Sequence, residues 1–241
     1  MPVRTGRNLR LEPGVRRHPG RADHRDHHRA GGIPSAVPIR EGRGMMGPDE
    51  LRLRILEVAR AMAKAGLARG SSGNVSARIE DGILITASGI PYERLAADGI
   101  IEIDLDGGKR SGKGAPSSEW RMHAEIYRRR EDVAAIVHTH SPYATAAAIS
   151  LDFLPIVHDE GRILFGEGTP VSDHAPPGTW DLARAVADAL DDRSSTLIAR
   201  HGAVAIGDSP EGALATAEKI EEAAQLFWLS RLLKEDHEGR G

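Results

Sequence analysis

Three histidines have the spacing that a metal site needs. His138 and His140 lie two positions apart at the end of an apolar run, residues 133–137, which has the composition of a buried strand. Side chains alternate along a strand, so both imidazoles point to the same face and can reach one ion. His201 follows a second apolar run, residues 196–199. A catalytic zinc ion keeps one position open beside three protein ligands. The alternative for His138 and His140 is an ordinary pair of surface or core histidines that binds no metal.

Three short turns combine small residues, hydroxyl groups and backbone N–H groups, and lie at residues 70–74, 88–89 and 116–118. Such groups satisfy the oxygens of a phosphate, especially at the start of a helix. Glu119 follows the third turn directly, where a carboxylate can act as a general base beside a metal. Each turn alone is also an ordinary turn or helix cap, and Glu119 an ordinary carboxylate at a helix start. The functional interpretation requires that these groups meet at one site.

Several other kinds of site are excluded. The glycines at 112–114 and 166–168 complete neither a phosphate-binding Walker loop nor a dinucleotide motif. The chain has no nucleophile elbow, no His-Glu-x-x-His pair and no cysteine, so thiol chemistry, thiolate zinc sites and disulfides are ruled out. No run approaches 18 apolar residues, so we expect no membrane span.

The elements that must position these residues follow from hydrophobic periodicity. Strands are predicted at residues 75–79, 83–86, 100–105, 133–137, 196–199 and 203–206, with a hairpin turn at 80–82. Helices are predicted at residues 48–66, 119–129, 142–149, 179–190 and 210–233. Helices alternate with strands, and several strands form antiparallel pairs. The pattern therefore predicts an α/β fold: a single layered domain with a mixed, largely antiparallel central sheet flanked by helices.

Residues 1–44 have a different composition from the rest. They contain ten Arg, four acidic residues and no Lys, a net charge of +6, whereas residues 45–241 have 22 basic and 31 acidic residues, a net of −9. Apolar periodicity is absent before Pro48, so we predict a disordered basic leader followed by a domain at 45–241. A nucleic-acid-binding arm and an Arg-rich transit peptide are alternatives. We favour a mis-assigned translation start, with the true start at Met45 or Met46.

Five motifs occur in order: GNVS at 73–76, LITASGIPY at 84–92, PSSEWRMH at 116–123, HTH at 138–140 and HG at 201–202. Together they resemble the zinc-dependent class II aldolase/adducin family, most closely its fuculose-phosphate aldolase branch. The resemblance covers roughly residues 51–229. It implies a homotetramer with active sites between subunits and one divalent ion per subunit.

By this resemblance His138, His140 and His201 would ligate the metal, and Glu119 would be both a ligand and the catalytic acid/base. The residues that would bind the substrate phosphate are Gly73, Asn74, Ser88, Gly89, Ser117 and Ser118. The implied reaction is retro-aldol cleavage of a ketose 1-phosphate, such as L-fuculose 1-phosphate, to dihydroxyacetone phosphate and an aldehyde. Zn²⁺ is the expected cofactor, with Mn²⁺, Co²⁺ or Fe²⁺ as alternatives because similar ligands suit them. We expect a phosphorylated sugar as partner, a cytoplasmic enzyme, and no nucleic-acid or membrane partner.

One departure affects the substrate. Where the fuculose branch has a tyrosine that protonates the aldehyde oxygen, this chain has Asp159 followed by Glu160. The related L-ribulose-5-phosphate 4-epimerases carry a carboxylate in this region, so Asp159 is predicted as a catalytic proton donor, a solvated turn being the alternative. An epimerase or another sugar-phosphate enzyme of the family is the alternative function. A non-catalytic adducin-like module is the alternative of another class, although a scaffold has no need of all four metal-site side chains.

Overall fold

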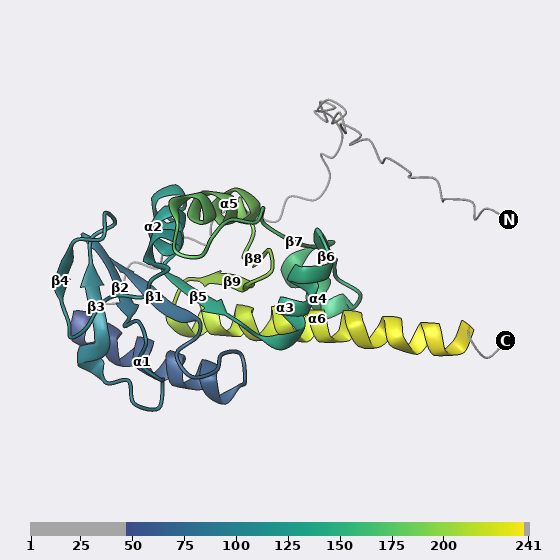
Figure 1. The fold of residues 1–241 in the computed structure, drawn as a ribbon, viewed down its shortest axis with the longest axis horizontal. Coiled ribbons are helices and arrows are strands. Elements are labelled where there is room, and N and C mark those ends of the chain that lie inside the picture. Colours follow the sequence, from purple (N-terminus) through teal and green to yellow (C-terminus); the bar gives the residue numbers. More distant parts are fainter. Residues whose placement is uncertain (1–46, 239–241) are drawn as a thin grey trace, which may run out of the picture. The chain divides into compact units, whose positions relative to one another are not determined.

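The structure is a computed structural model that describes residues 47–238 (Figure 1). Its central feature is a seven-stranded sheet with the strand order β4-β3-β2-β1-β5-β9-β8. The strands are β1 (Asn74–Ile79), β2 (Gly82–Thr86), β3 (Ile100–Ile103), β4 (Lys109–Ser111), β5 (Ala135–Thr139), β8 (Ser195–Ile198) and β9 (Gly202–Gly207). Each strand is antiparallel to its neighbours. The predicted leader, residues 1–44, lies outside the described residues.

Helices cover both faces of this sheet (Figure 1). On one face α1 (Pro48–Lys64) and α6 (Pro210–Glu238) pack against the strands and against each other. On the other face lie α2 (Trp120–Arg129) and α5 (Trp180–Leu190), which pack together. The α/β fold with a largely antiparallel sheet is therefore confirmed. Within the described residues, parallel pairing is limited to the single bridge between Val171 and Leu197.

A smaller group of elements packs beside α6. It comprises α3 (Pro142–Ser150), α4 (Asp159–Phe165) and the two-stranded sheet of β6 (Phe153–Pro155) and β7 (Gly168–Pro170). Small residues of α3, such as Ala144 and Ala147, are fully buried and let α6 approach closely. This group forms a second hydrophobic cluster with Ile220 and Phe227 of α6, separate from the main core.

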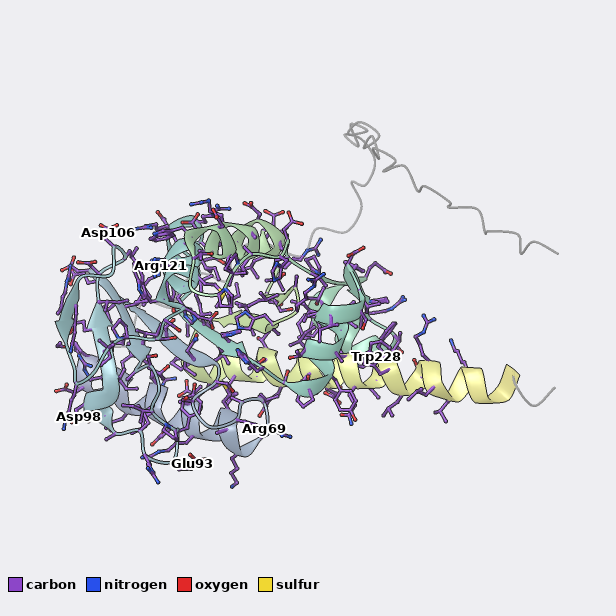
Figure 2. All side chains as sticks on the ribbon, in the orientation of Figure 1. Arg69, Glu93, Asp98, Asp106, Arg121 and Trp228 are labelled. Atoms are coloured by element: carbon purple, nitrogen blue, oxygen red, sulfur yellow. The ribbon has the colours of Figure 1, made fainter. Side chains whose placement is uncertain are left out.

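The last turns of α6 extend beyond the other elements (Figure 2, in which Trp228 marks the region where this extension begins). Leucines are exposed there, whereas Ala223, Ala224 and Phe227 are buried against α3 and the sheet. None of the described helices is both long enough and apolar enough to cross a membrane.

The predicted long elements agree with the structure to within a few residues. Five shorter elements were not predicted: the 3-10 turn Ala97–Gly99, β4, β6, β7 and α4. Each spans seven residues or fewer. At Asp159 the structure has the first residue of α4 rather than a turn, and Asp159 and Glu160 are exposed there.

Candidate active site

The candidate site lies at one edge of the sheet, where three neighbouring strands begin or end. Asn74, the first residue of β1, pairs with His138 near the end of β5, and His138 pairs with Val204 near the start of β9. In antiparallel strands the end of one lies beside the start of the next, so residues distant in sequence meet at this edge. Gly202 opens β9 against β5, and a Cβ there would collide with the carbonyl oxygen of Thr139.

Four side chains form a compact group that can hold a metal ion. They are Glu119, His138, His140 and His201, and one potential ligand atom from each lies within 4.8 Å of the others. Glu119 Oε2 is 2.9 Å from His138 Nε2, and Glu119 Oε1 is 3.5 Å from His201 Nε2. The Nε2 atoms of His138 and His140 are 2.9 Å apart. The structure therefore brings together all four predicted ligands.

Electrostatics keep Glu119 ionised. Burial acts to raise the pKa of this carboxyl, but the adjacent His138, His201 and His140 lower it to about 2. Burial acts to lower the pKa of His138, and the charge and hydrogen bond of Glu119 outweigh it, so that the pKa of His138 is raised. An ionised carboxylate among converging imidazoles attracts a cation, either a proton on His138 or a metal ion that replaces it.

The other two histidines remain neutral, as metal ligands must be. Burial, together with the charge of His138, lowers the pKa of His140 to about 4 and also lowers that of His201. His138 Nδ1 is 2.9 Å from the carbonyl oxygen of Ala203. A carbonyl only accepts, so Nδ1 carries the hydrogen and Nε2 is free to face the group.

Two observations show that this group fits a metal ion. Glu119 Oε1 is buried and has no hydrogen-bond partner within the described residues, although it lies among imidazole nitrogens. The close Nε2 atoms of His138 and His140 would repel each other unless a proton or an ion lies between them. Three nitrogen donors and one carboxylate are a ligand set suited to zinc and similar divalent metals.

A cleft of about 310 Å³ opens beside this group. The residues that line it are Ser71, Ser72, Gly73, Asn74, Ala87, Ser88, Ser117, Ser118, Glu119, His140, Pro177 and His201. All three predicted phosphate turns therefore meet at one place. Within the described residues, neither lysine nor arginine is part of this lining. Hydroxyl and N–H groups are the donors that the cleft offers to an anion.

A hydrogen bond from a buried tyrosine supports the turn at the start of β1. The hydroxyl of Tyr92 donates to the carbonyl oxygen of Gly73 at 2.7 Å, and Tyr92 is almost fully buried. Gly73 has φ of +71°, and a Cβ there would lie 2.5 Å from the carbonyl oxygen of His138. Only glycine combines this conformation with so close an approach. The turn therefore lies directly against β5 at His138, one of the four residues of the candidate metal site.

Asn74 links the cleft to the carboxylate. Its side-chain amide donates to Ser117 Oγ at 3.0 Å and lies 3.4 Å from Glu119 Oε2, at the edge of hydrogen-bond range. Glu119 itself is the residue before α2, and its backbone N–H donates to Ser117 Oγ at 3.3 Å. The predicted phosphate-binding residues and the predicted base are thus in direct contact.

Three of the predicted site residues do not line the cleft. His138 is fully buried within the four-residue group. Gly89 follows Ser88 and is exposed, and Asp159 is exposed at the first position of α4. Ala87 and Pro177 also line the cleft, although their positions in the sequence did not predict it. Pro177 comes from the loop between β7 and α5, where the Pro-Pro-Gly sequence indicates a turn but gives no clue that the turn faces the cleft.

Residues 53–228 match the sequence profile of the Class II Aldolase and Adducin N-terminal domain. The chain belongs to this family. It is 40% identical over 182 residues to the L-fuculose phosphate aldolase of Escherichia coli K12, a match that covers 76% of this chain and 84% of the relative. It is also 37% identical over 178 residues to the 5-methylthioribulose-1-phosphate/5-deoxyribulose-1-phosphate aldolase of Rhodospirillum rubrum, covering 74% and 80% of the two chains.

Solved structures of the family have the same fold. An L-fuculose 1-phosphate aldolase structure superposes with a TM-score of 0.74 at 29% identity, over 78% of this chain and 89% of the other. The l-fuculose-1-phosphate aldolase of Thermus thermophilus gives a TM-score of 0.68 at 31% identity, over 77% and 96%. Within the class II aldolase family, the chain is an enzyme of the aldehyde-lyase type.

Proposed function

We propose that this enzyme is a metal-dependent aldolase that cleaves a ketose 1-phosphate, such as L-fuculose 1-phosphate, to dihydroxyacetone phosphate and an aldehyde. The observation that carries the proposal is that the four-donor group lies beside a cleft lined by hydroxyl and N–H groups. A phosphate in the cleft would fix the substrate carbonyl beside the metal ligands.

The proposed ligands are Glu119, His138, His140 and His201. When bound, a divalent ion, with Zn²⁺ as the proposed metal, supplies Lewis-acid stabilisation to the substrate oxygens. The residues proposed to bind the phosphate, through hydroxyl, amide and backbone N–H donors, are Gly73, Asn74, Ser88, Gly89, Ser117 and Ser118. Gly89 would contribute its N–H from the exposed end of the Ser88 turn.

Glu119 is the proposed acid/base. Cleavage of the carbon–carbon bond leaves an electron pair on the carbon next to the carbonyl, and that carbon must then receive a proton. In the direction of bond formation the same carbon loses its proton to a base. The carboxyl of Glu119 has a lowered pKa and is therefore ionised, and Glu119 lines the cleft together with His140 and His201, which suits this transfer.

Asp159 is proposed to exchange the proton of the aldehyde oxygen. Cleavage requires a group that accepts the proton of the hydroxyl that becomes the aldehyde, and bond formation requires its return. Asp159 is exposed and does not line the cleft of its own chain. Its proposed role therefore depends on a second copy of the chain that places α4 near the cleft, as in a homotetramer with active sites between subunits. We place this reaction in the cytoplasm, because a charged sugar phosphate does not cross a membrane unaided.

The candidate substrates differ in the part that becomes the aldehyde. The Rhodospirillum rubrum relative is named for 5-methylthioribulose 1-phosphate and 5-deoxyribulose 1-phosphate, which differ from L-fuculose 1-phosphate only at the end that becomes the aldehyde. Both are ketose 1-phosphates and would place the same phosphate and carbonyl at the site. They are the second candidate substrates.

The test is an assay of protein reconstituted with Zn²⁺ against the 1-phosphates of fuculose, rhamnulose, 5-deoxyribulose and methylthioribulose, and against ribulose 5-phosphate. Release of dihydroxyacetone phosphate and an aldehyde identifies an aldolase, whereas an isomer of unchanged mass identifies an epimerase. We expect Glu119→Gln to retain the metal through three histidines and to lose at least about a hundredfold in kcat, since a positioned acid/base contributes that much. Full turnover by this variant would remove Glu119 from the mechanism. Protein that binds no divalent metal and cleaves none of the panel would overturn the proposal.

A further inference from the structure

Helix α3 starts two residues after His140, and its N-terminus is capped in an unusual way. Ser141 is the N-cap residue, but its side chain makes no capping hydrogen bond. Pro142 has no N–H group, and the first bond within the helix runs from Thr145 N to Ser141 O. The N–H groups of Tyr143 and Ala144 therefore lack partners within α3, as at every helix start.

Glu221 of α6 supplies both missing acceptors. Its Oε1 accepts from Tyr143 N at 2.9 Å, and its Oε2 accepts from Ala144 N at 2.8 Å. Glu221 follows Tyr143 by 78 positions and Ala144 by 77, so the cap comes from a distant part of the sequence. A carboxylate at this position also interacts favourably with the positive end of the helix dipole. Among the described residues, no cationic side chain pairs with Glu221.

This cap affects His140 because it helps to fix the backbone on which that residue lies. The backbone N–H of His140 donates to the carbonyl oxygen of Leu67 at 3.0 Å. On the other side, the chain passes through Ser141, which is fully buried, into the turn that Glu221 closes. The backbone near His140 is therefore fixed by the hydrogen bond of its own N–H and by the two that Glu221 accepts three and four residues later.

The side chain of His140 has less support than that of its neighbour. His138 is oriented through Nδ1, which bonds the carbonyl oxygen of Ala203. For His140, the hydrogen bonds within the described residues include none at Nδ1. The direction of its imidazole consequently depends on the backbone that carries it. Groups that orient metal ligands are known to change metal affinity when they are removed.

We propose that Glu221 is a positioning residue of the metal centre: by closing the first turn of α3, it holds the backbone from which His140 reaches the ion. The inference rests on the metal site of the proposed function. It assigns a role in metal binding to a side chain of α6 that is not one of the four proposed ligands.

The test compares Glu221→Gln with Glu222→Gln. In Glu221→Gln the new amide would keep one acceptor oxygen but turn an NH₂ group toward the second N–H, leaving that donor unsatisfied. Glu222 is the next residue, is exposed, and contacts Lys219 Nζ at 2.9 Å, so its substitution removes the same charge from the same helix. Zn²⁺ affinity is measured at 25 °C by competition with a chromophoric chelator, the visible spectrum of the Co²⁺-loaded protein reports ligand geometry, and circular dichroism reports the fold.

We expect Glu221→Gln to bind Zn²⁺ about 10- to 100-fold more weakly and to alter the Co²⁺ spectrum, while Glu222→Gln matches the unsubstituted protein. Should Glu221→Gln not fold, Glu221→Asp keeps the charge but is one methylene shorter, and an intermediate loss of affinity is expected. A folded variant with lowered thermal stability but unchanged affinity and Co²⁺ spectrum would show a merely structural cap and overturn the inference. Unsubstituted protein that binds no metal would instead overturn the proposed function itself.

Discussion

At the scale of single residues, His123 shows how strongly burial shapes this site. It lies one helical turn after Glu119 and is fully buried. Its Nδ1 is 2.7 Å from Ser76 Oγ, which is itself 2.8 Å from the hydroxyl of Tyr127. Burial, with a smaller contribution from His138, lowers the pKa of His123 to about 3. The imidazole is therefore neutral in the folded protein at any pH near neutrality.

This lowered pKa predicts a loss of stability in mild acid. The unfolded chain takes up a proton at His123 below pH 6.5, the ordinary value, whereas the folded chain does so only near pH 3. Unfolded molecules bind more protons between these values, so the free energy of unfolding falls as the pH falls through 6.5. Between pH 7.5 and 5.5 the contribution of His123 is about 1.4 kcal/mol.

Urea unfolding of the metal-free protein at pH 7.5 and 5.5 measures this contribution. His123→Asn keeps an acceptor for Ser76 but cannot titrate, so the difference in unfolding free energy between the two pH values should shrink by that amount. His174→Asn is the matched control, because His174 is exposed. An equal pH dependence in all three proteins would contradict the prediction.

The three histidines of the candidate metal site could be proposed from sequence because they follow regular apolar strands, whereas Glu119 was predicted as a ligand only through the family resemblance. The clustering of the three phosphate turns could not be derived from any single turn, and came from the family resemblance. Tyr92, Pro177 and Glu221 were missed as site or supporting residues. Each acts across the fold, and local sequence carries no record of which distant group a side chain will meet.

At the scale of elements, the site depends on the contact between β5 and β9. These strands pair from Ala135 with Gly207 to Thr139 with Ala203. The pairing brings the residue before β9, His201, beside the end of β5. Gly202 makes the approach possible, since any Cβ at this position would strike the carbonyl oxygen of Thr139 and come within 3.4 Å of the Cα of His140.

Gly202→Ala should therefore weaken both the fold and the metal site. The obstacle is backbone, which cannot rotate away, so β9 must shift from β5 and carry His201 with it. Overpacking of this kind costs about 2 kcal/mol. Denaturant unfolding measures the stability, and a Zn²⁺ titration measures the site.

Gly212→Ala serves as the control for this substitution. A Cβ at Gly212, in the first turn of α6, meets only side-chain atoms of Asp208 and Ser209 within 4 Å, and these can move. We expect this variant to retain its Zn²⁺ affinity. If Gly202→Ala retained both its stability and its affinity as well, the close approach would not matter for the site.

The elements that sequence periodicity missed are those that distant contacts stabilise. β4 is a short polar strand at the sheet edge, and Arg52 of α1 bonds both Ser111 in β4 and Glu102 in β3. α4 is seven residues long, and Lys219 of α6 pairs with Glu160 in its first turn at 2.8 Å. Segments this short carry too few apolar positions for a period to be recognised.

At the scale of the whole molecule, the end of α6 has apolar surface that its own chain does not bury. Leu229, Leu232 and Leu233 are 42%, 58% and 63% exposed. Ile163 and Leu164 on α4 are also exposed, at 82% and 49%. Clustered exposed leucines on a helix are typical of a surface that another chain covers. This is consistent with the proposed homotetramer, in which Asp159 on α4 would serve a neighbouring cleft.

A double substitution of Leu229 and Leu232 by Glu should dissociate the proposed homotetramer. If the two leucines are covered between subunits, their loss removes about 3 kcal/mol of association free energy, or about a hundredfold in the dissociation constant. Sedimentation velocity at micromolar concentration measures the size of the particle. Lys234→Glu adds negative charge on the same segment without removing apolar surface, and should leave the assembly intact. An unsubstituted protein that sediments as a monomer would contradict the tetramer.

The antiparallel order β1-β5-β9 also determines the stage of folding at which the four side chains of the candidate metal site come together. β5 can pair with β1 as soon as both are made, but β9 begins only at Gly202, and the sheet order places it directly against β5. His201 joins the other ligands through that last pairing, and α6, which carries Glu221, follows it in the chain. A growing or partly folded chain thus holds an incomplete set of donors. Tight binding of a metal at the proposed site would therefore mark a chain that has finished folding, and the ion would stabilise the completed domain rather than start its assembly.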